Sequence, residues 1–170
     1  MRETLDEIER LEQLLEISAA GAGPHLREVI TQERRLTAAQ VCECLQGMRL
    51  LVLGTVTADG RPLVGPVDGY FIHGDFWFSS GKDSVRMKHI AARPFVSATH
   101  LPSEQLAITV HGRAEIFELT DPGQPELRQA MLDHYLPIAG EGFRDWVDSG
   151  DSYGARIRAD KMFTFYMPAT

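Results

Sequence analysis

The sequence predicts a mainly β protein with short peripheral helices, arranged as a small antiparallel barrel of about six strands. Apolar segments bounded by Gly, Pro and Asp recur through the middle of the chain and at its end. An Asp-Gly hairpin signal within "ADGRP" joins the first two of these segments. Helical periodicity is confined to residues 1–47, 84–92 and 126–147, so the helices are expected at the periphery.

The beginning of the chain is expected to be helical. Apolar residues repeat at helical spacing from Leu5 onwards, until "GAGP" interrupts the pattern. Thr37 and Gln40 form a capping-box pair that begins a further helix. We therefore divide the chain into an N-terminal helical extension over residues 1–36 and a barrel domain over residues 37–170.

The strands are expected where the apolar segments lie. They are residues 49–56, 62–72, 76–80, 95–100, 106–118 and, as one or two strands, 155–167. The second of these contains Gly65 and Pro66, which an internal strand tolerates poorly. This strand is therefore expected to bulge or to be approached closely by another group.

Composition excludes several classes of protein. The net charge is -7, which argues against nucleic-acid and anionic-membrane partners, because both require a basic surface. No apolar run approaches the ~20 residues of a membrane helix, and the acidic N-terminus is unlike a signal peptide, so a cytoplasmic protein is expected. Cys42 and Cys44 are predicted to be reduced packing residues, and the scattered histidines form no metal motif.

A basic cluster stands out in this acidic chain, in the stretch "FSSGKDSVRMKHI". Ser84 is expected to cap a helix that begins at Val85, and cations near a helix N-terminus oppose the helix dipole unless an anion joins them. Phosphate is the natural anion for such a site, whereas a solvated basic helix face is the alternative. The candidate ligands are Ser79, Ser80, Lys82, Ser84, Arg86 and Lys88.

Three stretches taken together resemble one known family. "LGTVTADGRPLVGPV", "FWFSSGKDSVRMKHIAARPFVSAT" and "HGRAEIFE" are similar in order and spacing to the pyridoxamine 5'-phosphate oxidase-like superfamily, over about residues 37–118. The resemblance implies a six-stranded split β-barrel, a homodimer and FMN bound between the subunits. It also implies that the flavin ring lies along the strand containing Val64, Gly65, Pro66 and Val67, and that the basic cluster holds the phosphate.

The chain departs from the family pattern in two places. Val85 and Arg86 follow Ser84 where the family often has Arg-Lys, which keeps only part of the charge. The C-terminal "KMFTFYMPAT" lacks the arginine-rich substrate motif of the true pyridoxamine phosphate oxidases, which argues against vitamin B6 oxidation. Trp77 and Trp146 are expected in the core.

The expected function is that of an FMN-dependent oxidoreductase that acts on a small molecule, with no catalytic side chain identified. The end of the chain, from "MLDHYLPIAGEGFRDW" onwards, resembles the branch that uses the deazaflavin F-420, so an F-420-dependent reductase is one alternative. A non-catalytic carrier or sensor of flavin, haem or another tetrapyrrole is the other.

Overall fold

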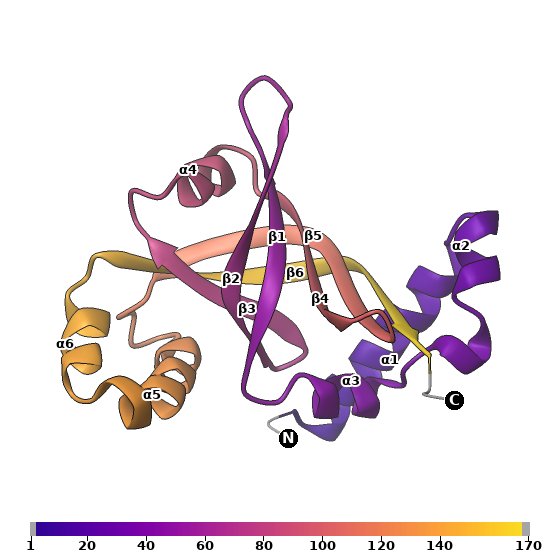
Figure 1. Ribbon diagram of the computed structural model, residues 1–170, viewed down its shortest axis with the longest axis horizontal. Helices are drawn as coiled ribbons and strands as arrows, with labels where there is room; N and C mark the ends of the chain where they lie inside the picture. The colour runs from indigo at the N-terminus through magenta and orange to yellow at the C-terminus, as the bar shows by residue number, and fades with distance from the viewer. Residues whose placement is uncertain (1–2, 168–170) are drawn as a thin grey trace.

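A computed structural model describes residues 3–167 as a closed barrel of six antiparallel strands (Figure 1). Neighbouring strands follow the order β1-β2-β3-β6-β5-β4 around the barrel. The strands are β1 (Met48–Val56), β2 (Pro62–Ile72), β3 (Asp75–Gly81), β4 (Phe95–Ser103), β5 (Leu106–Glu118) and β6 (Ser152–Tyr166). The predicted fold class is confirmed, and the last segment is one strand that begins at Ser152, before the predicted start at residue 155.

The helices lie around the barrel, with α4 beside the β1–β2 hairpin and α5 and α6 together on another side (Figure 1). They are α1 (Leu5–Ala20), α2 (Pro24–Val29), the 3-10 helix η1 (Gln32–Arg34), α3 (Ala38–Cys44), α4 (Val85–Ala92), α5 (Pro125–Ala139) and α6 (Gly142–Asp148). The capping box of Thr37 and Gln40 is present at the start of α3. Within residues 3–167, no helix combines the length and the apolar character needed to cross a membrane.

Helix α1 packs against β6 and shares the barrel's core. Leu11 and Leu15 belong to the same buried cluster as the interior strand residues. Ser18, also buried, donates to the Leu14 carbonyl and accepts the Met162 backbone N–H at 3.0 Å. Residues 1–2 of the predicted N-terminal extension and residues 168–170 of the predicted barrel domain lie outside the described residues.

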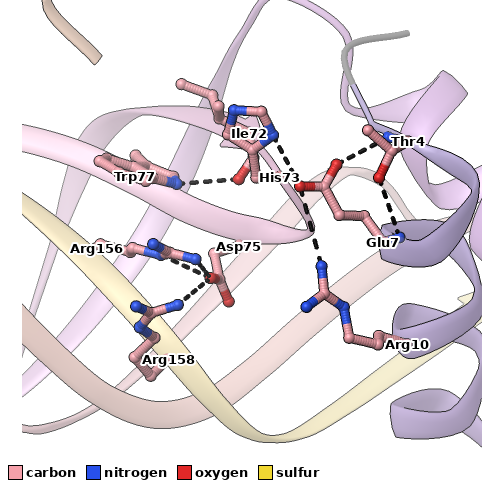
Figure 2. Close-up of polar contacts among 9 residues, drawn as sticks. All are labelled: Thr4, Glu7, Arg10, Ile72, His73, Asp75, Trp77, Arg156 and Arg158. Atoms are coloured by element: carbon pink, nitrogen blue, oxygen red, sulfur yellow. Dashed lines mark hydrogen bonds and ion pairs between the residues drawn. The ribbon is translucent and has the colours of Figure 1, made fainter. Parts of the chain in front are cut away.

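A second contact joins α1 to the barrel at the β2–β3 turn, as Figure 2 shows. The Glu7 carboxylate accepts the Thr4 N–H at 2.8 Å and lies 3.0 Å from His73 Nδ1. His73 has φ +54° and Gly74 has φ +81°, the sign that a type I′ hairpin requires at both positions. The beginning of α1 is thus tied to the turn between two barrel strands.

A smaller core lies outside the barrel, between α5 and the outward faces of β2 and β3. Tyr70, Ile72 and Trp77 pack there against apolar side chains of α5, and the Trp77 indole donates to the Ile72 carbonyl (Figure 2). Trp77 is buried as predicted. The prediction for Trp146 was wrong, because α6 turns Val147 inward and leaves the Trp146 side chain 48% exposed.

The two cysteines are free thiols in and near the barrel core. Cys42 is buried, and this burial, with the nearby Glu3 carboxylate, raises the pKa of its thiol to about 12. A thiol with so high a pKa is a poor nucleophile. Cys42 therefore acts as a packing residue in the core.

Candidate functional site

Strands β2 and β3 of the barrel pair over only part of their length. Strand β2 pairs with β1 from Pro62 to Tyr70, but its ladder with β3 covers only Gly69–Ile72. Beyond Phe78, β3 pairs with β6 and not with β2. Within the described chain, residues 62–68 of β2 therefore have no strand on their β3 side, and the backbone groups along this edge are available to another partner.

Helix α4 is fixed beside this edge by contacts with the β1–β2 hairpin. The Arg93 side chain donates to the Val56 carbonyl at 3.0 Å. The Thr55 hydroxyl lies 3.1 Å from His89 Nδ1. These contacts hold α4 against β1, so that the first turn of the helix lies near β2.

Arg86 bridges α4 and the open edge of β2. Its Nη1 donates to the Pro66 carbonyl at 2.8 Å. A Cβ atom at Gly65 would lie only 3.2 Å from Arg86 Nη2, so a glycine at this position lets the guanidinium approach the backbone. Proline fits at position 66, because its missing N–H costs little on an unpaired edge. The structure thus brings together the two segments for which the sequence predicted a cofactor, the start of α4 and residues 64–67 of β2.

The serines predicted to bind phosphate lie at the start of α4 and the end of β3. Ser84 caps α4 by accepting the Met87 N–H at 3.3 Å, and Ser80 donates to the Ser84 hydroxyl at 3.1 Å. Ser79 is half-buried opposite Gly154 of β6. Ser80 and Ser84 are therefore joined at the N-terminus of α4, and Arg86 lies in the first turn of the same helix.

The remaining cations lie elsewhere. Lys82 forms a 2.6 Å ion pair with Glu118 and lies over the Tyr153 ring, while Lys88 is 3.5 Å from Asp83. Both lysines line a groove of about 560 Å³ between α4 and β5, away from β2. The cluster that appears continuous in the sequence is thus divided between two faces of α4.

Two of the β2 residues predicted to lie along the flavin ring differ in exposure. Val64 is 64% exposed near the tip of the hairpin. Val67 packs in the barrel core, so that only its backbone can meet a ligand. Whether these residues bind a cofactor stays a prediction.

Two residues at this edge were not predicted as part of a site. Asp68 follows Val67, and its Oδ2 accepts the Tyr135 hydroxyl from α5 at 2.5 Å. Burial, the hydrogen bond and the charge of Asp68 together raise the pKa of Tyr135 to about 12. The only sequence signal was a carboxylate within an otherwise apolar strand.

Three solved structures with this fold have names that mention a cofactor. The haem storage protein HutZ of Vibrio cholerae is 18% identical, with a TM-score of 0.63, and the match covers 75% of this chain and 93% of that one. An FAD-binding protein of Mesorhizobium loti is 21% identical with a TM-score of 0.55, covering 77% and 93%. An F420 reductase is 20% identical with a TM-score of 0.53, covering 71% and 93%.

The family assignment comes from the sequence match to a family model. Among curated protein sequences, no match to this chain is found. The family model described as pyridoxamine 5'-phosphate oxidase matches residues 37–163, which is most of the chain and all but the end of its barrel. With the six-stranded barrel, this match shows that the chain belongs to the pyridoxamine 5'-phosphate oxidase-like split-barrel superfamily.

Proposed function

We propose that the protein is a flavin-dependent oxidoreductase that binds FMN along the open edge of β2 and acts on a small organic molecule. The observation that carries this proposal is the bridge from Arg86 to the Pro66 carbonyl, where the first turn of a helix lies beside the unpaired edge of a strand. A phosphate and a flat ring joined by a short linker fit such a pair of surfaces.

The residues present suit this cofactor. Ser80, Ser84 and Arg86 would hold the phosphate, with the first N–H groups of α4 adding favourable dipole charge. The backbone of residues 64–67 would hold the ring, since Gly65 allows close approach there. Bound FMN supplies the hydride and electron chemistry, and the chain supplies orientation, electrostatics and the exclusion of water.

A homodimer belongs to the same proposal. Leu50 and Val52 on β1 and Leu101 on β4 are 61%, 48% and 59% exposed. The β1–β4 ladder pairs Val52 with Thr99, and continuing that register brings Leu50 opposite Leu101. An exposed apolar patch of this kind favours an interface, and a second copy would also cover the flavin edge.

The test is a set of cofactor titrations on the purified protein. FMN, F-420 and haem are added separately, and absorbance and flavin fluorescence are followed. FMN bound at micromolar concentration or tighter, and reduced and reoxidised while bound, is the expected result. The F420 reductase and HutZ among the structural neighbours make the other two titrations necessary. Binding of F-420 or haem without FMN would replace the proposal with the corresponding alternative.

A further inference from the structure

Two side chains from the helices contact β2 along its open edge. Arg86 contacts it at Pro66, and Tyr135 contacts it at Asp68. Pro66 and Asp68 are two residues apart, so they lie on the same face of the strand, about 7 Å from each other. A ligand that follows the edge from Arg86 therefore reaches Asp68 at its other end.

The Asp68–Tyr135 pair presents hydrogen-bond acceptors. The Tyr135 proton is already directed at Asp68 Oδ2, and an ionised carboxylate has no proton to give. What the pair offers to a ligand is lone pairs and negative charge. Its complement is an N–H or O–H group, whereas a carboxylate or a carbonyl at this position would be repelled.

The acceptor oxygens are held in place by packing. The Tyr135 ring lies 4.8 Å from the Phe143 ring of α6 and 4.6 Å from the His134 ring. Arg128 of α5 and Asp148, the last residue of α6, form an ion pair at 2.7 Å that joins the two helices. Groups fixed on packed elements discriminate better between ligands than groups on loops.

We infer that Asp68, held by Tyr135, binds the imide N–H of the flavin ring and so selects a flavin or a deazaflavin over a tetrapyrrole. This inference rests on the proposed function, which places the phosphate at Arg86 and the ring along residues 64–67, directly before Asp68 on the same strand. The edge of both FMN and F-420 carries one N–H between two carbonyl groups. A haem presents carboxylates at its edge, and these would meet a carboxylate.

The experiment compares FMN with FMN methylated at the imide nitrogen, which has lost this one N–H donor. The wild-type protein should bind FMN at least about tenfold more tightly, as expected for a hydrogen bond to a charged group. Asp68→Ala should bind the two flavins with nearly equal affinity. Asp160→Ala removes a carboxylate at an exposed position of β6 and should keep the wild-type preference, which makes it the matched control.

Each outcome separates the inference from the proposed function. Equal binding of both flavins by the wild type, or an undiminished preference in Asp68→Ala, would overturn the inference and leave the FMN site standing. No binding of FMN at all would overturn both. If Asp68→Ala does not fold, Asp68→Asn gives the same comparison, and its preference for FMN should fall below that of the wild type.

Discussion

Lys82 lies just before α4 and Arg86 lies in its first turn, yet their surroundings differ. The Arg86 guanidinium reaches over β2 and donates to the Pro66 carbonyl, which leaves further N–H groups for the proposed phosphate. Lys82 is engaged by Glu118 on the other side of the helix. Spacing along the sequence could not separate them, because the direction of each side chain depends on a strand distant in the sequence, β2 for Arg86 and β5 for Lys82.

The first prediction follows from this difference. Arg86→Ala should weaken FMN binding by about 1.5–3 kcal/mol, the scale of a lost hydrogen bond to a charged group. Lys82→Ala should change it by less than about 0.5 kcal/mol, because its ammonium group is already paired with Glu118 and lies away from β2. Fluorescence titrations at one ionic strength measure both values, with a thermal melt of each apo variant as the control for folding. Equal losses in the two variants would contradict the division of the cluster.

His73 tests whether the β2–β3 turn is governed by its backbone or by its contact with Glu7. At φ +54° an Asn is favoured and a β-branched residue is strained. We expect His73→Asn to leave the free energy of unfolding within about 0.5 kcal/mol, since a single polar contact of a partly exposed side chain contributes little. His73→Val should cost about 1–2 kcal/mol. Urea unfolding of both variants checks this, and a larger loss in His73→Asn would show that the Glu7 contact dominates.

At the scale of elements, the β5–β6 ladder requires a glycine at position 112. Gly112 lies beside a bulge in the pairing of the two strands, where an added Cβ would overlap the Arg158 carbonyl. Because this obstacle is backbone, Gly112→Ala should cost about 2–3 kcal/mol or more in the free energy of unfolding. Gly54→Ala is the matched control on β1, since its nearest atom would be 3.5 Å away, and it should be close to neutral. Similar melting temperatures for the two variants would show that the bulge adapts.

Helix α1 gives a prediction for pH. Burial of the Glu7 carboxyl raises its pKa, but the Thr4 N–H bond and the His73 contact outweigh this and hold it below the usual value. A depressed pKa stabilises the fold above the unfolded-state value of about 4.3, and this stability is lost as the pH falls. Glu7→Gln should therefore destabilise the protein at pH 7 by about 0.3–1 kcal/mol, and the difference should shrink as the pH falls below about 4 and through the lowered pKa of Glu7.

Unfolding free energies of the two proteins between pH 3 and pH 7 measure this effect. Glu16→Gln, an exposed substitution in the last part of the same helix, should show no such trend. A constant difference between the wild type and Glu7→Gln at all pH values would mean that the carboxylate charge plays no part in docking α1.

At the scale of the whole molecule, local signals were sufficient for the fold. The Asp-Gly hairpin, the capping box of Thr37 and the period of the apolar segments each depend on a few neighbouring residues. The hairpin, α3 and the strands formed where these signals indicated, except that β6 begins earlier, at Ser152. The site needed more. Asp68 and Tyr135 are 67 residues apart, and their meeting depends on how α5 packs on β2, which no local pattern encodes.

The last prediction concerns assembly. Leu50, Val52 and Leu101 lie on the outward face of the barrel, and in Figure 1 β1 crosses the front of the barrel with no helix over it. If this face pairs with a second copy, Val52→Asp should bury a charge in an apolar interface and shift the protein to a monomer. Ile138→Asp, at an exposed apolar residue of α5, changes the same charge outside this face and should leave the dimer intact. Sedimentation at micromolar concentration measures both variants, each with its thermal melt.

Because the flavin edge is proposed to lie between the subunits, Val52→Asp should also weaken FMN binding at protein concentrations where the wild type is dimeric. A wild-type monomer would contradict the homodimer, and a Val52→Asp dimer would place the interface away from β1 and β4.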